Sequence, residues 1–236
     1  MKIKNKKSFI LGLISNIIIC VCIFSVFELC FSGVIQTSGA VTQAIYHGNK
    51  QNKNATLMIN VYWGTEYIDS MLDVLDSYNI KTTFFVGGYW VQQNEDMLNK
   101  IIEKGHEIGN HGYYHKDQDK LSYNQNLEEI SMNHRLVQSL CNYEMKLFAP
   151  PSGAFNNNTL NASYDLGYKT IMWTKDTIDW RDKNSDLIYK RATKNMSNGD
   201  LILMHPTEHT VKALENIILT YQNAGFKLTT VSENIC

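Results

Sequence analysis

Short apolar segments alternate with amphipathic ones along the chain from Ala55 onward. The first pair is a strand predicted over Thr56–Val61 and a helix whose apolar residues recur at helical spacing. A second pair follows, with a β-branched and aromatic strand over Thr82–Val86 and a helix between Asn94 as N-cap and Gly105 as its stop. The apolar faces of the two helices consist of Ile68, Met71, Leu72 and Leu75, and of Met97, Leu98, Ile101 and Ile102.

The same alternation continues to the C-terminus. A long helix is predicted over Leu121–Leu140. The later strands are predicted over Lys146–Phe148, Tyr168–Trp173, Leu201–Met204 and Phe226–Thr230. A helix lies between each strand and the next: the first ends near Gly167, the second begins near Ser185 and the third ends near Gly225. Strands and helices at these intervals indicate a parallel sheet covered by helices, either an open doubly wound sheet or a (β/α) barrel. Periodicity alone does not choose between the two.

The first 31 residues carry a different pattern. Four lysines precede an apolar run from Phe9 to Phe27, which is long enough to cross a bilayer because a spanning helix takes roughly 20 residues. Residues 1–31 are therefore predicted to form a transmembrane signal anchor, with the lysines inside and the rest of the chain outside the cell membrane. Cleavage after Ala40, which would give a secreted protein, is the alternative. Residues 32–54 are polar and are predicted as a linker to one domain over 55–236.

Composition and charge narrow the class of protein. The 236 residues are 44% hydrophobic and 19% charged, which is enough apolar material for one sizeable core. From Ala55 onward the chain has 16 basic and 22 acidic side chains, a net charge of −6, which argues against nucleic acid as a partner. No glycine-rich phosphate loop is present, so no nucleotide partner is expected. Cys141 and Cys236 are the only cysteines of this region, so no disulfide framework is implied.

Candidate chemistry lies in the histidine-rich stretch Glu103–His115. His111 and His115 stand four residues apart, and on a helical turn this spacing places both imidazoles on one face, where they could hold a metal ion. The alternative is that they are surface or packing histidines. His106, beside a predicted strand, is expected to be a structural histidine.

Other polar and aromatic residues follow the predicted strands. In both candidate architectures the chemistry lies at the C-terminal ends of the strands. The residues at these ends are Tyr62, Trp63, Gly64 and Glu66, then His111 and His115, then Pro151 and Ser152, then Asp176, Asp179 and Trp180, and finally His205.

With these residues the sequence resembles a known family, the polysaccharide deacetylases with a NodB homology domain, carbohydrate esterase family 4. The resemblance covers roughly Ala55–Val231, and its clearest motifs are Asn110–His115, Asp176–Trp180 and Leu203–His205. It is similar to the sporulation-associated branch of the family in two further stretches, Asn60–Gly64 and Phe148–Gly153. The resemblance implies a distorted (β/α) barrel of about seven parallel strands.

The resemblance also implies an activity, the metal-assisted removal of N-acetyl groups from peptidoglycan or a related N-acetylated glycan. His111 and His115 match the two histidines that hold the divalent metal, zinc or a similar ion, in the family. His205 matches the acid that protonates the leaving amine, and Asp179 belongs to the network that orients catalytic groups. The residues expected to contact the glycan are Trp180, Leu203, Pro151, Ser152, Tyr62 and Trp63.

The sequence departs from the family in the first motif, which normally reads Thr-Phe-Asp-Asp-Gly. Tyr62 aligns with the aspartate that acts as base, and a phenol with a pKa near ~10 is a poor base at neutral pH. Trp63 aligns with the aspartate that is the third metal ligand, and an indole has no lone pair to donate to the ion. Ala149 stands in place of the arginine that steers the base, and Ser152 in place of an aromatic residue.

Two functions therefore remain open at this point. In the first, the protein is a membrane-anchored deacetylase with a rearranged metal site, whose third ligand comes from Glu66, Asp69 or Asn60. In the second, it is a catalytically inactive glycan-binding or structural protein of the cell envelope with the same fold.

Overall fold

The computed structural model describes residues 9, 10, 12–14, 16–21 and 43–236. The chain divides into two units, Met1–Val41 and Thr42–Cys236. Much of the signal anchor predicted over 1–31 lies outside the described residues. The first part of the linker predicted over 32–54, residues 32–42, also lies outside them. Within the ranges, the structure contains no helix with the length and apolar character needed to cross a membrane.

β1 (Asn54–Val61) is the central strand of a parallel sheet and is buried over nearly its whole length. The strands follow the order β5-β4-β3-β2-β1-β7-β6, and β8 pairs with the start of β1. Every pair is parallel. The other strands are β2 (Thr83–Val86), β3 (Glu107–Asn110), β4 (Leu147–Phe148), β5 (Lys169–Thr170), β6 (Lys175–Asp176), β7 (Asp200–Met204) and β8 (Lys227–Leu228).

The sheet curves into a half-barrel that does not close. β5 and β6 stand at the two ends of the strand order, and among the described residues they are not paired with each other. Both have only two residues in hydrogen-bonded register, which is too little to complete a ring of strands. The predicted barrel of about seven parallel strands is confirmed in the number and direction of its strands, but the ring stays open.

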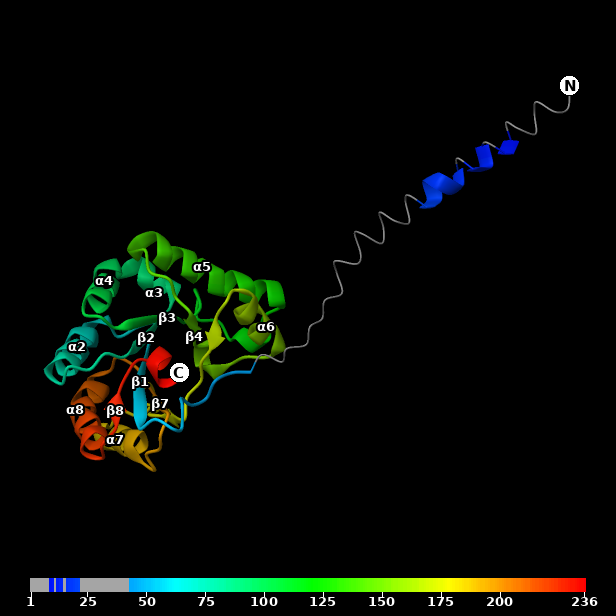
Figure 1. Ribbon diagram of the computed structural model, residues 1–236. Helices are drawn as coiled ribbons and strands as arrows, with labels where there is room; N and C mark the ends of the chain where they lie inside the picture. Colours follow the sequence, from blue (N-terminus) through cyan, green and yellow to red (C-terminus); the bar gives the residue numbers. More distant parts are fainter. Residues whose placement is uncertain (1–8, 11, 15, 22–42) are drawn as a thin grey trace, which may run out of the picture. The chain divides into compact units, whose positions relative to one another are not determined.

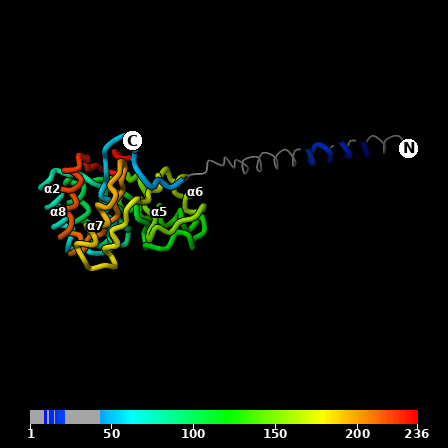
Figure 2. The backbone as a smooth tube through the Cα atoms, turned by 90° about the horizontal axis from the view of Figure 1, so that it is seen from below, coloured from blue at the N-terminus to red at the C-terminus, as the bar shows by residue number. Residues whose placement is uncertain are grey.

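Helices surround the strands (Figure 1). They are α2 (Ile68–Ser77), α3 (Gly88–Gln93), α4 (Glu95–Glu103), α5 (Tyr123–Cys141), α6 (Asn157–Asp165), α7 (Ser185–Thr193), α8 (Glu208–Asn223) and α9 (Val231–Asn234), with 3-10 turns η1 (Thr65–Tyr67), η2 (Gln118–Lys120) and η3 (Pro151–Gly153). Figure 2 shows α2, α7 and α8 along one side of the domain and α5 and α6 along the other. Ser122 and Gln125 form a capping box that starts α5, close to the predicted helix boundary.

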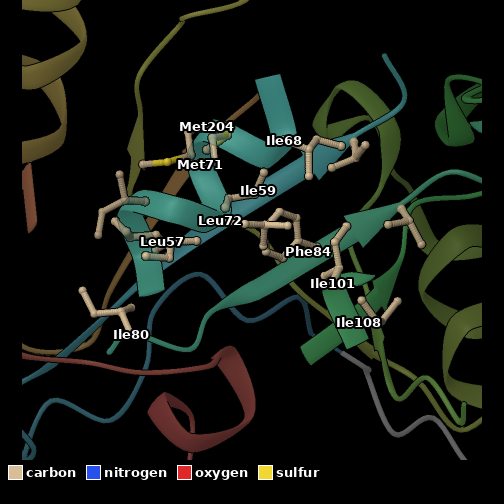
Figure 3. Close-up of a cluster of buried hydrophobic side chains, with 14 of the residues drawn as sticks. Leu57, Ile59, Ile68, Met71, Leu72, Ile80, Phe84, Ile101, Ile108 and Met204 are labelled. Atoms are coloured by element: carbon tan, nitrogen blue, oxygen red, sulfur yellow. The ribbon is translucent and has the colours of Figure 1, made fainter. Parts of the chain in front are cut away.

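Side chains of β1 alternate between two apolar clusters. Leu57 and Ile59 point toward the helices, where they pack with Met71 and Leu72 of α2 (Figure 3). Met58 points to the other face and packs in the interior of the half-barrel. The remaining buried members of that interior cluster are Phe85, Leu147, Ala149, Ile171, Leu201 and Val231. Since alternate residues of a strand share a face, Asn60 and Tyr62 continue the interior row beyond Met58.

Residues 43–53, within the predicted linker, pack against this domain. Ile45 forms a parallel bridge with Ile171 beside β5. Gly48 N donates to Gly199 O at 2.7 Å, and a Cβ on Gly48 would lie 2.2 Å from Asn234 Oδ1. The close approach of these three residues leaves no room for a side chain at position 48.

His106 is a buried histidine at the opposite ends of the strands from the site described below. It is 3% exposed, and its Nδ1 accepts a hydrogen bond from Thr82 N at 3.2 Å. Burial lowers the pKa of His106 from 6.5 to about 4, with a smaller contribution from the positive charge of Lys81. The imidazole is therefore neutral at neutral pH, as expected for a structural histidine.

The domain is expected to lose stability in mild acid because of His106. The pKa of this imidazole is about 4 when folded and near 6.5 when unfolded, so the unfolded chain binds more protons between these values. Its contribution to stability is present above pH 6.5 and falls as the pH drops toward 4, by about 2 kcal/mol between pH 6.5 and pH 4.5. His106→Asn keeps an acceptor for Thr82 N, and urea unfolding at several pH values should show a flatter pH profile for this variant. Identical profiles for variant and wild type would contradict the expectation.

Candidate functional site

A cavity of about 320 Å³ lies at the C-terminal ends of the strands. It is lined by Asn60, Tyr62, Trp63, His111, His115, Ser152, Trp173, Asp176, Trp180, Leu203 and His205. Residues from five separate parts of the chain therefore meet at this edge of the sheet, as the positions after the predicted strands indicated. Two of the residues to which the resemblance gives a role do not line the cavity. Asp179 is buried behind His205, and Pro151 packs near Gly112.

His111 and His115 come together through a loop, which corrects the helical turn assumed from their spacing. The residues from His111 to His115 lie outside all helices, and both Gly112 and His115 have positive φ, 71° and 56°. The two imidazole rings are 5.0 Å apart between centroids and nearly perpendicular, at 75°. The left-handed backbone, rather than a helical face, turns both side chains into the cavity.

Both imidazoles of this pair are neutral at neutral pH. His111 Nδ1 lies 2.7 Å from Ala149 O, and because a carbonyl only accepts, Nδ1 carries the proton and Nε2 the lone pair. Burial lowers the pKa of His111 to about 3, and the neighbouring His115 adds to the shift. Burial also lowers the pKa of His115. Each ring thus has the protonation state that a metal ligand needs.

The loop that carries His115 is held by Glu129 of α5, which sequence reasoning missed. Glu129 Oε2 accepts hydrogen bonds from Tyr113 N at 3.0 Å and Tyr114 N at 2.9 Å, and Oε1 pairs with Lys116 Nζ at 2.9 Å. The Glu129 side chain is only 4% exposed. The sequence did offer a sign of this role, because Glu129 is an acidic residue on the apolar face of a long amphipathic helix, and a buried carboxylate needs hydrogen-bond partners.

Tyr62 fills the space beside the histidine pair. Its ring lies 4.8 Å from that of His115 between centroids. The ring also packs against Gly87, where a Cβ would lie 2.4 Å from Tyr62 Cδ2. Burial raises the pKa of Tyr62, so the phenol keeps its proton at neutral pH and is no base.

The donor set of the cavity does not fit the metal ion that the resemblance implies. Among the described residues, no group of three or more His, Cys, Asp or Glu side chains is placed to hold an ion. Glu66 and Asp69 do not line the cavity, and Asp69 pairs with Lys100 at 2.7 Å on the surface. Asn60 does line it, but a neutral amide oxygen is not among the usual ligands of protein-bound zinc. Two imidazoles remain where catalytic zinc sites have three protein ligands.

His205 is held firmly by Asp179. His205 Nδ1 lies 2.7 Å from Asp179 Oδ1, and His205 N donates to Asp179 Oδ2 at 2.7 Å. Thr210 Oγ1 donates to the same Oδ2 at 2.6 Å. Trp63 stacks on the His205 ring, with centroids 5.7 Å apart and planes 8° apart. The indole therefore covers one face of the imidazole that matches the family's acid.

The loop after β1 is in close contact with the loop after β7. Gly64 has φ 79°, and a Cβ there would lie 2.1 Å from Pro206 O. A glycine is required at this position for both reasons. The close approach fixes Trp63, the residue before it, over His205.

Exposed aromatic side chains line part of the cavity. Trp180 is 56% exposed and Trp63 is 44% exposed. Trp173 also lines the cavity, which the sequence interpretation missed because Trp173 was counted as part of a strand. Asp176 lines it as well, and Asp176 Oδ1 accepts a hydrogen bond from Ile178 N at 2.8 Å, which supports the left-handed Ile178. Aromatic faces beside polar groups are typical of sites that bind sugar rings.

Comparisons with known proteins find related sequences. The family model "Polysaccharide deacetylase" matches residues 47–171. An uncharacterized protein of Bacillus subtilis, YlxY, is 38% identical over 191 residues, which are 81% of this chain and 60% of YlxY. A peptidoglycan-N-acetylglucosamine deacetylase of Bacillus cereus is 31% identical over 173 residues, which are 71% of this chain and 81% of that enzyme.

Solved structures include a similar protein described as a pseudoenzyme. The wild-type BA3943 protein of Bacillus anthracis, a CE4 family pseudoenzyme, superposes with a TM-score of 0.81 at 34% identity. The match covers 83% of this chain and 69% of that one. A mutant of BA3943 described as having restored enzymatic activity superposes with a TM-score of 0.80 at 32% identity, over 83% of this chain and 72% of that one.

Proposed function

Since the chain belongs to the polysaccharide deacetylase family, we propose that its cavity binds an N-acetylated cell-wall glycan, such as peptidoglycan, without removing the acetyl groups. The single observation that carries the proposal is the ring of Tyr62 beside His115, where the family has a carboxylate. Tyr62 is neither a ligand nor a base at neutral pH, because burial raises the pKa of its phenol. The residues for holding a sugar are present, and those for hydrolysis are incomplete.

Support for glycan as the ligand comes from the cavity and from the relatives. The Bacillus cereus relative is a peptidoglycan-N-acetylglucosamine deacetylase, so N-acetylated peptidoglycan is the ligand class to test first. The cavity is lined by the exposed indoles of Trp63 and Trp180 and by the imidazoles of His111, His115 and His205. Indole faces stack on the C–H faces of sugars, and imidazoles hydrogen-bond to hydroxyl groups.

Support for the loss of hydrolysis comes from the donor set. Metal-assisted deacetylation needs a bound ion, and no third His, Cys, Asp or Glu joins His111 and His115 in the described part of the chain. Trp63, at the position of the missing ligand, instead lies on the ring of His205. The similarity to BA3943, a pseudoenzyme of the same family, is compatible with this function.

The setting of this function stays a proposal. A signal anchor over residues 1–31 would hold the domain outside the cell membrane, where peptidoglycan is found, and cleavage after Ala40 would secrete it. A role in sporulation remains a prediction from the resemblance in Asn60–Gly64 and Phe148–Gly153.

Two measurements on the same protein test the proposed function. Calorimetric titration with N-acetylglucosamine oligomers and peptidoglycan fragments should show binding, and Trp180→Ala should weaken it about tenfold because one stacking face is lost. Tyr164→Ala is the matched control, since Tyr164 is 58% exposed and does not line the cavity. Acetate release should stay at background with added zinc, cobalt or manganese. Acetate release that depends on His205 would instead establish the deacetylase, and absence of glycan binding would refute the glycan-binding function.

A further inference from the structure

Asn110, the last residue of β3, holds the loop that carries two of the site histidines, residues 111–115, which we call the histidine loop. Its side chain is buried, and its Oδ1 accepts a hydrogen bond from Gly112 N at 2.9 Å, where the backbone has a positive φ of 71°. An amide turned over would place the donor Nδ2 against the N–H of Gly112. The shape of the histidine loop therefore depends on the orientation of the Asn110 amide.

The other edge of this amide is held by Tyr168. Asn110 Nδ2 donates to Tyr168 Oη at 3.2 Å and to Ile130 O at 2.8 Å. Burial raises the pKa of Tyr168, so the phenol keeps its proton and needs an acceptor for it. That acceptor is His134 Nδ1 of α5, which lies 2.6 Å from Tyr168 Oη. Three hydrogen bonds in series therefore connect Gly112 to His134, each with its donor on the side of the histidine loop.

His134 is the end of this series that solvent reaches. Its side chain is 26% exposed, and its Nε2 lies 3.4 Å from Glu144 Oε2 in the segment between α5 and β4. Glu144 Oε1 pairs in turn with Lys146 Nζ at 2.5 Å. Because Nδ1 accepts from Tyr168, Nε2 carries the proton of the neutral ring. A proton added to the ring goes to Nδ1, where it faces the hydroxyl of Tyr168.

We propose that His134 and Tyr168 position the histidine loop through Asn110, so that the cavity binds its ligand most tightly while His134 is neutral. With Nδ1 protonated, Tyr168 can no longer donate to it, and the phenol proton needs another acceptor. The amide of Asn110 can supply one only by turning over, which places Nδ2 against Gly112 N and breaks the hydrogen bond that shapes the loop. The inference rests on the proposed glycan-binding function and adds positioning residues to its site.

The two positioning residues act from outside the cavity. Neither His134 nor Tyr168 lines it, so their effect on a bound ligand has to pass through the histidine loop. The loop continues directly from Asn110 into His111, whose imidazole does line the cavity. A change in the Asn110 amide is therefore passed to the binding residues through the backbone alone. Because histidine changes its charge between about pH 5 and about pH 8, binding should weaken in mild acid.

Calorimetric titration with N-acetylglucosamine oligomer at two pH values tests the series. The wild type should bind about fivefold more weakly at about pH 5.5 than at about pH 7.5, which corresponds to the loss of one hydrogen bond. His134→Asn places an uncharged acceptor near the position of Nδ1 and should bind equally well at both pH values. His134→Leu offers no acceptor and should bind weakly at both.

Tyr143→Phe is the matched control for Tyr168→Phe. Tyr143 Oη accepts a hydrogen bond from Ile108 N at 3.1 Å, so it holds the same strand β3 without reaching the histidine loop. Tyr168→Phe should weaken binding about fivefold at about pH 7.5, whereas Tyr143→Phe should leave binding unchanged. Urea unfolding of both variants shows whether a loss of binding merely follows a loss of stability.

A measurement without ligand covers the case in which a variant does not fold. In the wild type, the backbone amide resonance of Gly112 should shift with the same pH midpoint as the ring resonances of His134. A Gly112 resonance that does not follow His134, or equal pH dependence of binding in wild type and His134→Asn, would overturn the positioning role and leave glycan binding intact. Failure of the wild type to bind the oligomer at either pH would instead refute the proposed function, while the Gly112 resonance would still test the series.

Discussion

Replacing Tyr62 and Trp63 by aspartate is expected to give the domain a zinc site and acetate-releasing activity above the wild-type background. The double variant restores the two carboxylates of the family's first motif beside His111 and His115. Both imidazoles are already neutral and point into the same cavity, so one carboxylate completes a three-residue ligand set. Zinc affinity should rise on the order of 100-fold, because a third, charged ligand joins two neutral ones.

Activity of the double variant should follow from the same change. His205 stays oriented by Asp179 and would protonate the leaving amine, while the second carboxylate would act as base. Adding Ala149→Arg should raise the rate further, since the family's arginine steers that base. The BA3943 mutant described as having restored enzymatic activity shows that a pseudoenzyme of this family can regain activity.

Controls separate a new ligand set from a simple change of charge. Tyr164→Asp adds a carboxylate at an exposed position away from the cavity and should leave zinc affinity unchanged. His111→Ala in the double-variant background should abolish the gain. Zinc binding by the double variant no tighter than that of the wild type, measured by equilibrium titration, would show that the cavity cannot be completed by these two residues.

Sequence patterns predicted the parallel, helix-covered sheet because β1 and the helices after it have clear periodicity. The strand Thr56–Val61 and the helix over Leu121–Leu140 differ from β1 and α5 by only a few residues at their ends. Closure of the barrel was not predictable in this way, because it depends on pairing of two-residue strands such as β5. Their few residues carry no periodic signal.

Most members of the candidate site could be predicted, but Trp173, Glu129 and the geometry of the site could not. His111, His115 and His205 line one cavity, as the motifs indicated. The helical turn assumed for the histidine pair was wrong, because the spacing of two residues does not reveal the positive φ at Gly112 and His115. Glu129, which holds the histidine loop, was missed for a similar reason, since burial of a polar side chain depends on tertiary packing.

Asp179 is expected to contribute more to stability than any other polar residue around the cavity. It is 2% exposed and accepts hydrogen bonds from His205 N and Thr210 Oγ1, while its Oδ1 contacts His205 Nδ1. Asp179→Ala leaves these donors without their partner in a buried place and should lower the free energy of unfolding by about 3 kcal/mol. Urea unfolding at neutral pH measures the change.

Two variants with smaller effects separate the contributions at Asp179. Thr210→Val removes the hydrogen bond to Asp179 Oδ2 together with the hydroxyl contact between Thr210 and Thr207, and should lower the free energy of unfolding by about 1 to 2 kcal/mol. Asp179→Asn keeps one acceptor and should fall between Thr210→Val and Asp179→Ala. A loss below about 1 kcal/mol for Asp179→Ala would contradict the structural role.

A large loss of stability would change how the Asp179–His205 pair is interpreted. The pair joins the loop after β6 to the end of β7, and Thr210 connects both to the first turn of α8. Hydrogen bonds that join three elements in this way stabilise the fold whether or not the domain hydrolyses its ligand. The retained pair is therefore no evidence for catalysis in this chain, and the proposal that the domain does not hydrolyse its ligand depends instead on Tyr62 and Trp63, which stand where the family's first motif has aspartates.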